Sequence, residues 1–111
     1  YADRVGIERL CVYMGLKWAQ DPSPEDLTRQ NDEVLRAIAK HPDRSFGFVY
    51  CSAKHIERSL EELERCVARG PMVGVKLWVA DRCRDPKLDP LIRRAAEPKA
   101  VIFQHTWFKT Q

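Results

Sequence analysis

The sequence has 111 residues, which is enough for one domain but far short of the roughly 250 residues of a complete eight-stranded α/β barrel. Its composition is that of an ordinary soluble globular protein, and its small net charge of +3 comes from basic residues interleaved with acidic ones, which argues against nucleic-acid binding. No apolar run approaches the roughly 20 residues of a membrane span, and the first residues do not resemble a signal peptide, so we expect no membrane association.

The first part of the chain predicts a strand followed by a long helix. The opening residues resemble the end of a helix that stops at Gly6, and the first strand is expected over residues 10–14. Ser23 can cap the next helix and Pro24 suits its first position, whereas the proline after His41 should end it. The apolar face of this helix consists of Leu27, Val34, Leu35 and Ile38.

The rest of the chain continues the alternation of strands and helices. Strands are expected over residues 46–51, 73–79 and 101–104, since each is a short apolar run rich in β-branched and aromatic residues. Ser52 should cap a second helix, and a short third helix should begin at one of the two Asp-Pro pairs between residues 85 and 90. The second helix has an apolar stripe of Ile56, Leu60, Leu63 and Val67 and a solvated face of Glu57, Arg58, Glu61, Glu62 and Arg65.

This order of elements predicts an α/β fold. Strands and helices alternate without an Asn-Gly or Asp-Gly hairpin signal, which indicates a parallel sheet with strands in sequential order and right-handed crossovers. We expect the helices to cover one face of this sheet. No internal repeat, low-complexity tract or linker interrupts the pattern, so residues 1–111 are predicted to form a single domain.

The cysteines indicate a reducing compartment. Cys11, Cys51, Cys66 and Cys83 show no C-x-x-C spacing and no paired histidine motif, which makes a zinc cluster or a disulfide framework a poor explanation. Cys11 and Cys51 lie in expected strands and Cys66 on an apolar helix stripe, where a free thiol behaves as a small hydrophobe. We therefore predict reduced, buried cysteines and a cytoplasmic protein.

Polar side chains that could act on a ligand occur in the last two expected strands. Lys76 lies inside an otherwise apolar strand, and His105 ends the next one. Ligands of parallel α/β sheets bind at the carboxyl ends of the strands, so both residues fall where such folds place their chemistry. Trp78, Trp107 and Tyr50 also follow strand ends, where they could line a pocket or simply pack beneath loops.

Several segments, in the right order, resemble the amidohydrolase superfamily, in particular the branch of decarboxylases and hydrolases related to aminocarboxymuconate-semialdehyde decarboxylase. The passage from residue 2 to residue 9, Ala-Asp-Arg-Val-Gly-Ile-Glu-Arg, is similar to a family run of the form M-D-x-x-G-V-D-R. The other matching segments are residues 31–34, 41–44, 46–48, 60–65, 73–77, 88–91 and 104–106. The resemblance implies a part of a TIM-like (β/α)8 barrel, from about strand two to strand five.

The resemblance also implies a metal site of which this sequence holds only a part. Members of the family bind one or two divalent metals, for which zinc is the expected ion here, and the histidine that ends strand five is a ligand, which points to His105. The His-x-His pair of strand one and the aspartate of the last strand have no counterpart in these residues. A single histidine holds a metal weakly, so we expect weak or absent metal binding by this chain alone.

Three roles for Lys76 follow from its setting and from the resemblance. A buried lysine is costly unless it is paired, so its ammonium could form a salt bridge with a carboxylate at the barrel mouth. It could instead bind a substrate carboxylate and take part in catalysis. It could also be carbamylated to bridge two metals, as in other branches of the superfamily.

The function implied is that of a metal-dependent hydrolase or decarboxylase acting on a small carboxylated substrate, with His105 as a metal ligand and Lys76 as the catalytic and substrate-binding residue. Trp78, Trp107 and Tyr50 would line the pocket. The alternative is a non-catalytic α/β binding or assembly module with a vestigial site. Half a barrel leaves two open sheet edges, which a second copy of the chain or the missing barrel half would cover.

Overall fold

A computed structural model describes residue 6 and residues 8–14, 22–78 and 84–105. The strands are β1 (Leu10–Val12), β2 (Ser45–Tyr50), β3 (Gly74–Leu77) and β4 (Val101–Gln104), and the helices are α1 (Pro24–Lys40), α2 (Ile56–Leu63) and α3 (Asp89–Ala96). Short 3-10 turns precede α2 at Ala53–His55 (η3) and α3 at Pro86–Leu88 (η5), and a π-helical turn at Glu64–Ala68 (η4) extends α2. The helix expected at residues 1–5 lies outside the described residues.

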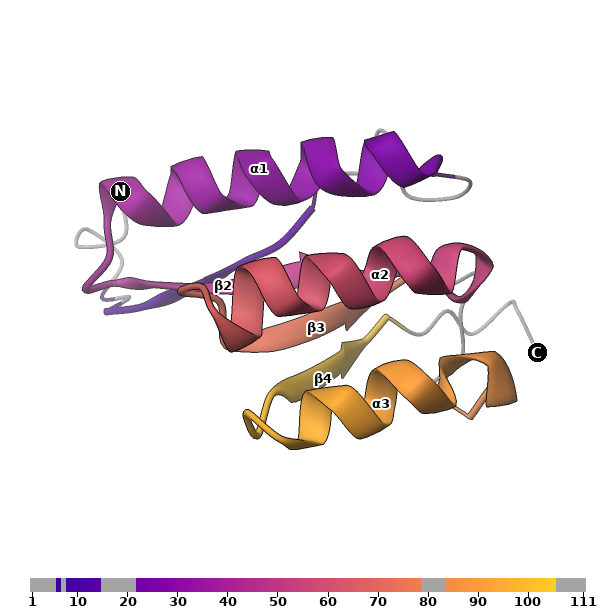
Figure 1. The fold of residues 1–111 in the computed structure, drawn as a ribbon. Helices are drawn as coiled ribbons and strands as arrows, with labels where there is room; N and C mark the ends of the chain where they lie inside the picture. The colour runs from indigo at the N-terminus through magenta and orange to yellow at the C-terminus, as the bar shows by residue number, and fades with distance from the viewer. Residues whose placement is uncertain (1–5, 7, 15–21, 79–83, 106–111) are drawn as a thin grey trace.

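The described strands form one parallel sheet in the order β1-β2-β3-β4, with the three helices on the same face (Figure 1). This confirms the predicted parallel α/β alternation, the sequential strand order and the placement of the helices. Each strand except β4 is shorter than expected or shifted by one residue, because the backbone pairing ends before the apolar run does. The carboxyl ends of all four strands meet at one end of the sheet.

The sequence explains where α1 begins and ends. Ser23 forms a capping box, in which its hydroxyl accepts from the Asp26 backbone N–H at 3.1 Å and the Asp26 carboxylate accepts from the Ser23 backbone N–H at 2.9 Å. Pro24 occupies the first turn, and the helix ends at Lys40, just before His41 and its following proline. Because α1 joins the parallel strands β1 and β2, its amino end lies beside the carboxyl ends of the strands (Figure 1).

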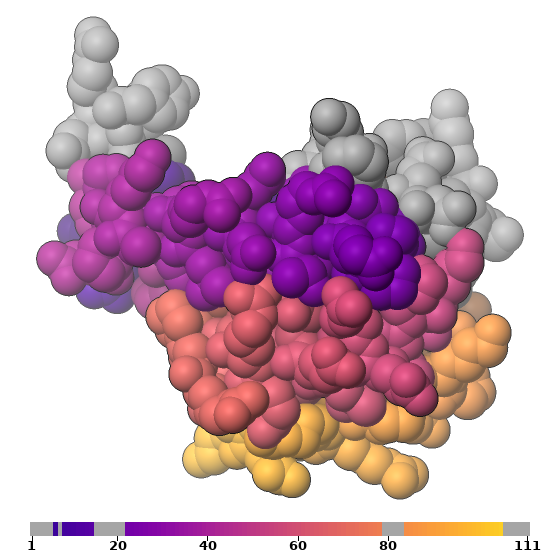
Figure 2. Space-filling view, turned by 45° about the horizontal axis from the view of Figure 1, so that its top comes forward, coloured from indigo at the N-terminus to yellow at the C-terminus, as the bar shows by residue number. Residues whose placement is uncertain are grey.

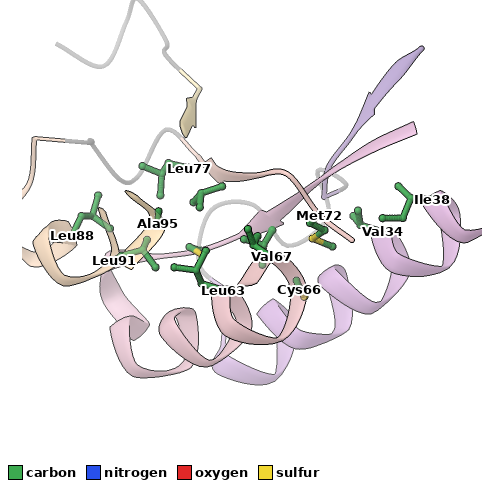
Figure 3. Close-up of a cluster of buried hydrophobic side chains, with 13 residues drawn as sticks. Val34, Ile38, Leu63, Cys66, Val67, Met72, Leu77, Leu88, Leu91 and Ala95 are labelled. Carbon is green, nitrogen blue, oxygen red and sulfur yellow. The ribbon is translucent and has the colours of Figure 1, made fainter. Parts of the chain in front are cut away.

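The main core lies between the helices and the sheet (Figure 3). Leu63 of α2, Leu77 of β3 and Leu91 of α3 are fully buried there, as the apolar stripes of the sequence predict. Seen from outside, α1, α2 and α3 form a continuous cover over this face (Figure 2). The sheet is therefore anchored on its outer face, and its opposite face is the one available for a site.

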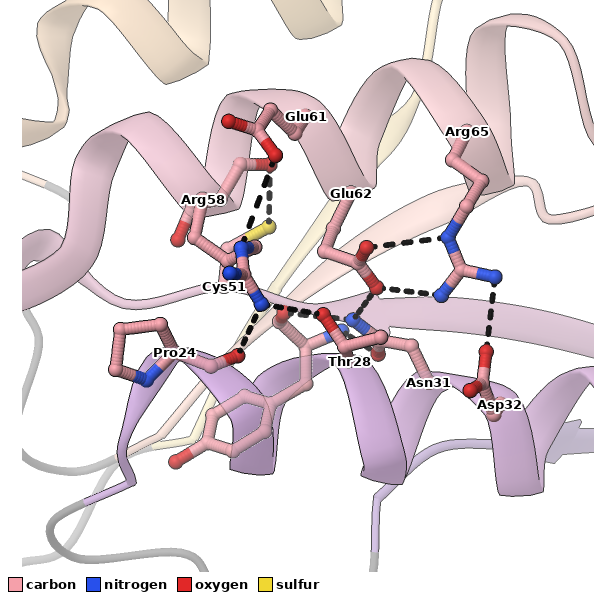
Figure 4. A network of polar contacts seen from close by, with 11 residues as sticks. Pro24, Thr28, Asn31, Asp32, Cys51, Arg58, Glu61, Glu62 and Arg65 are labelled. Atoms are coloured by element: carbon pink, nitrogen blue, oxygen red, sulfur yellow. Dashed lines mark hydrogen bonds and ion pairs between the residues drawn. The ribbon is translucent and has the colours of Figure 1, made fainter.

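A buried polar network joins α1, α2 and β2 (Figure 4). The Asn31 side chain accepts from the Tyr50 N–H at 2.7 Å and donates to the Tyr50 carbonyl at 3.2 Å and to Glu62 Oε1 at 3.0 Å. Glu62 also accepts two hydrogen bonds from Arg65, which in turn forms an ion pair with Asp32 at 2.8 Å. The network satisfies buried groups and ties both helices to the end of β2.

The prediction that Glu62 lies on a solvated face is wrong, because only 3% of it is exposed. Helix α2 is flanked by α1 as well as by the sheet, so its buried surface is wider than one apolar stripe. Ser59 and Cys66, which lie three and four residues from Glu62, are buried on the same side. A charged residue at this position is tolerated because Asn31 and Arg65 both donate to its carboxylate.

The predicted burial of the cysteines is confirmed for two of them and wrong for one. Cys51 and Cys66 are buried free thiols, and burial raises the pKa of the Cys66 thiol to about 11. Cys11 is free but exposed, because it is in register with Phe46 and therefore lies on the face of the sheet opposite the helices. Cys83 lies outside the described residues. In the described ranges, no helix is long and apolar enough to cross a membrane.

Candidate active site

The face of the sheet opposite the helices, called the inner face here, carries Phe48, Tyr50, Lys76, Trp78, Phe103 and His105. The parallel register sets Tyr50 beside Lys76, and Lys76 beside Phe103. Side chains two residues apart along a strand point to the same face, so Trp78 and His105 follow Lys76 and Phe103 toward the carboxyl end. Gly74 makes room for this arrangement, because a Cβ there would lie 2.6 Å from the Phe48 ring.

Lys76 is the most unusual residue of the inner face. Its side chain is fully buried, and within the described part of the chain its Nζ has no hydrogen-bond partner. Aromatic rings surround it instead, with Nζ 3.9 Å from the centroid of Phe103, 4.4 Å from that of Tyr13 and 5.6 Å from that of Trp78. Burial lowers the pKa of the Lys76 amine, since the charged form loses its hydration.

His105 and Trp78 form a stacked pair at the carboxyl end of the sheet. Their ring centroids are 4.0 Å apart, with an angle of 34° between the planes. The His105 backbone N–H donates to the Leu77 carbonyl at 2.8 Å, which continues the β3–β4 pairing by one residue. The Gln104 amide donates to the carbonyls of both Trp78 (3.2 Å) and His105 (2.9 Å), so the two strand ends are held together.

The structure therefore brings three of the predicted site residues together on one face and at one end. Lys76 contacts Trp78, and Trp78 contacts His105. Tyr50 is the neighbour of Lys76 in the sheet, but it is 1% exposed and packs in a small core with Met14, Leu27 and Trp78. Trp107 lies outside the described residues.

For one of the three roles considered for Lys76, a structural salt bridge at the barrel mouth, the described residues provide no partner. No described carboxylate lies within ion-pair distance of Nζ. The aromatic contacts explain how the side chain is accommodated without a counter-charge, because a ring face attracts a cation by about 0.5–2 kcal/mol. The roles that involve a ligand remain.

Two residues of this group were missed from the sequence, Tyr13 and Phe103. Both rings contact Lys76 Nζ, and they contact each other edge to face at 5.4 Å between centroids. The two-residue period could have identified Phe103, because it precedes His105 by two positions. Tyr13 could have been identified as the aromatic residue that follows the end of β1. Each is 38% exposed.

His105 fits a metal as one ligand of a larger set. Its half-buried imidazole lies on the inner face, and imidazole nitrogen is a common ligand of zinc. In the described ranges, no three His, Cys, Asp or Glu side chains are close enough together to hold a metal ion. The remaining ligands of any such site would have to come from elsewhere.

The fold and the inner face define a class: a run of parallel strands and outer helices from a TIM-type α/β barrel, with polar side chains at the carboxyl ends of its strands. No family model matches the chain. Its resemblance to decarboxylases of the amidohydrolase superfamily is nevertheless confirmed. The chain is 26% identical over 94 residues to 2-amino-3-carboxymuconate-6-semialdehyde decarboxylase from Dictyostelium discoideum.

Solved structures support the same fold. The chain aligns with 2,6-dihydroxybenzoate decarboxylase from Rhizobium over 94% of its length, with a TM-score of 0.79 and 22% identity. A structure of 2,6-dihydroxybenzoate decarboxylase complexed with 2,6-dihydroxybenzoate gives a TM-score of 0.80 at 22% identity and 96% coverage. For 5-carboxyvanillate decarboxylase from Sphingomonas paucimobilis the TM-score is 0.74 at 18% identity, with 94% of the chain covered.

The chain spans only part of each of these proteins. It matches 81% of its own residues to 26% of the Dictyostelium enzyme, and it covers 36%, 37% and 33% of the three solved chains. The chain therefore aligns with about a third of the length of the three solved barrel proteins. The other parts of these proteins have no counterpart among residues 1–111.

Proposed function

We propose that these residues form part of the active site of a metal-dependent decarboxylase that acts on a small, planar carboxylate. The observation that carries the proposal is the position of Lys76, a buried amine without a polar partner in the described chain, beside the Trp78–His105 pair at the carboxyl end of the sheet. Structural lysines are rarely left in this state, because burying an unpaired polar group costs roughly 1–3 kcal/mol. An arrangement that is unfavourable for folding supports a role in binding or chemistry.

Each of these residues has a part in the proposed chemistry. His105 would supply one ligand to a divalent metal, for which zinc is our expectation. When bound, the metal would polarise the substrate as a Lewis acid. Trp78 orients the His105 ring through their stacked contact, and Lys76 contacts the substrate on the same face. Tyr50 and Trp107 are proposed as further pocket walls.

The names of the relatives support decarboxylation over hydrolysis. The Dictyostelium relative and the three solved structures are all named as decarboxylases, and one structure contains 2,6-dihydroxybenzoate, an aromatic carboxylate. The aromatic rings around Lys76 suit such a planar substrate, since ring pairs add about 0.5–1.5 kcal/mol to the burial of their surface. The name of the Dictyostelium enzyme indicates a substrate that also has an aldehyde group.

The exposed rings of the inner face favour a larger assembly. Tyr13, Phe46 and Phe103 are each 38% exposed, which is unusual for neighbouring aromatic side chains on a sheet. We expect the remaining strands of a barrel, or a second copy of the chain, to cover them. Together with the reduced cysteines, our prediction is one domain of residues 1–111 that functions in the cytoplasm as part of such an assembly.

The test is CO2 release from 2,6-dihydroxybenzoate and 5-carboxyvanillate by the whole protein that contains these residues. We expect release that a chelator abolishes and zinc restores. His105→Ala should lower zinc affinity at least roughly tenfold and remove nearly all turnover, because a metal ligand is lost. The matched control is His41→Ala, which removes an exposed histidine at the opposite end of the sheet and should change neither quantity.

Retention of full turnover and zinc affinity by His105→Ala would contradict the assignment of the ligand. If the wild-type protein binds zinc and both acids but releases no CO2, the non-catalytic binding module becomes the better explanation. Release of a hydrolysis product from an ester or amide of the same acids, with no CO2, would replace decarboxylation by hydrolysis.

A further inference from the structure

Lys76 differs from the other lysines of the described chain in its surroundings. Lys40 and Lys87 are exposed to solvent, whereas Lys76 is fully buried beneath aromatic rings. Its neighbours in the sheet are Tyr50 and Phe103, so β2 and β4 place no charged group beside it. From the residues that follow β1, the titratable group that faces it is the phenol of Tyr13. Among the described residues, the amine is thus surrounded by the faces of aromatic rings.

The charge state of this amine depends on two opposing effects. Contact with the rings stabilises the ammonium form by about 0.5–2 kcal/mol at each well-placed face. Removing an ammonium ion from water costs several kcal/mol, and no described carboxylate compensates for it. Desolvation is the larger effect, and it lowers the pKa of Lys76 from its ordinary value. The neutral amine, which is the nucleophilic form, is populated more than in an exposed lysine.

A ligand has only a short way to go to reach Nζ. The two nearest rings, Tyr13 and Phe103, are partly exposed, so the amine lies one ring below the surface of the inner face. Displacing either ring opens the amine to a planar molecule, which would replace the lost ring contact with its own. His105 lies two residues beyond Phe103 along β4, or about 7 Å toward the carboxyl end. A small substrate can span that distance.

We propose that Lys76 is a covalent binding site for a carbonyl group, at which Nζ forms an imine with an aldehyde or ketone of a planar, carboxylate-bearing substrate. The geometry that supports this is an enclosed amine without a hydrogen-bond acceptor or counter-ion in the described residues, which is the environment that activates lysine for imine formation. Imine formation would add a covalent step to the proposed decarboxylation. It rests on the proposed function only in taking the substrate to carry a carboxylate.

The step balances without any other reactant. The Nζ lone pair attacks the carbonyl carbon to give a carbinolamine, and the carbonyl oxygen then leaves as water with both protons of the amine. The product is an imine between Nζ and the former carbonyl carbon. Solvent then protonates the imine nitrogen. In a substrate whose carboxylate is attached to the carbon next to the imine carbon, the protonated imine accepts the electron pair of the C–C bond to the carboxylate as that bond breaks. CO2 departs, the enamine takes up a proton at carbon, and water releases the product and restores Lys76.

The experiment is reductive trapping on the whole protein with 4-carboxybenzaldehyde and cyanoborohydride, followed by peptide mass spectrometry. At neutral pH we expect Lys76 to be modified at least roughly tenfold faster than Lys40 or Lys87 although it is buried, because burial lowers the pKa of Lys76 and so enlarges the fraction of the neutral, nucleophilic amine. Excess benzoate should protect Lys76 and leave the other two lysines unchanged. Phe103→Leu keeps an apolar cover but removes a ring, and should raise the trapping rate.

Labelling of Lys40 and Lys87 with none at Lys76 overturns the proposal, as does labelling of Lys76 that benzoate does not reduce. The CO2 assay on the same sample separates this inference from the proposed function. If CO2 is released and Lys76 is not trapped, imine formation is wrong and decarboxylation stands. If Lys76 is trapped and protected but no CO2 is released, the carbonyl site is supported and the proposed decarboxylation fails.

Discussion

The two faces of the sheet bury polar side chains under different conditions. On the helix-covered face, Asn31 and Glu62 are buried with hydrogen bonds from several partners, and Arg65 extends the network to the surface (Figure 4). On the inner face, Lys76 is equally buried, but among the described residues its Nζ contacts aromatic rings and has no hydrogen-bond partner. The buried polar groups of the outer face are hydrogen-bonded, as expected for a stable protein, whereas the inner face buries the Lys76 amine without such bonds from the described residues. That difference is the basis for locating function on the inner face.

The largest effect on stability is expected from the outer core. Leu63→Ala should lower the free energy of unfolding by about 3 kcal/mol, because it leaves a cavity around a fully buried side chain (Figure 3). Phe103→Ala on the inner face should lower it by only about 1 kcal/mol, since that ring is 38% exposed. Denaturant unfolding measures both. Equal losses would mean that the two faces contribute alike, which contradicts the comparison.

The polar network should show the next largest effect. The Cys51 N–H donates to the backbone carbonyl of Lys76 in β3. The Tyr50 N–H and carbonyl therefore point away from β3, toward the side where β1 has already ended. The Asn31 side chain forms the hydrogen bonds with the Tyr50 N–H and carbonyl that a neighbouring strand would otherwise form. Asn31→Ala should therefore lower the free energy of unfolding by about 2–3 kcal/mol.

The control for this variant is Glu33→Ala, which removes an exposed side chain two residues away on α1 and should change the stability by less than about 0.5 kcal/mol. If Asn31→Ala behaves like the control in denaturant unfolding, the network is not a stabilising feature of the outer face. The two faces of the sheet would then no longer differ in how well their buried polar groups are stabilised.

The smallest stability effect should appear as a dependence on pH. Lys76→Met keeps the contacts with the rings and removes an amine whose pKa is lowered by burial. Between the lowered pKa and the ordinary value of 10.5, the unfolded chain binds more protons than the folded one, so the stability of the wild type rises with pH across that window. The rise is about 1.4 kcal/mol for each unit of lowering.

Lys76→Met should lack this rise, and below the window it should be more stable than the wild type. Denaturant midpoints of the two proteins from neutral pH to about pH 11 measure the difference. Parallel curves would show that Lys76 has the same proton affinity in the folded and unfolded states, and would remove the electrostatic part of the account.

Much of the fold could be predicted from the sequence, because its signals are local. Ser23 and Pro24 mark the start of α1, and the apolar runs identify all four strands and their parallel order. Glu62 and Cys11 were placed wrongly for a shared reason. The exposure of these side chains depends on which other helices and strands pack against them. The spacing of apolar residues along a single helix or strand does not predict that packing.

The candidate site was predicted only in part. The positions of Lys76, Trp78 and His105 follow from the two-residue period and from the shared end of parallel strands. The aromatic contacts of Lys76 could not be predicted, because Tyr13 follows β1, a strand that is not adjacent to β3, and reaches the amine across the face. The absence of a described counter-charge likewise depends on three-dimensional packing.

The central claim is that Lys76 is retained for function at the expense of stability. The most direct test measures CO2 release from 2,6-dihydroxybenzoate and the free energy of unfolding at neutral pH on the same preparations of wild type, Lys76→Met and the exposed-lysine control Lys87→Met. Our account predicts that Lys76→Met loses at least about 100-fold in turnover while its stability is unchanged or about 1 kcal/mol higher, and that the control matches the wild type in both. Turnover of Lys76→Met within about twofold of the wild type, or a marked loss of its stability, would contradict the claim.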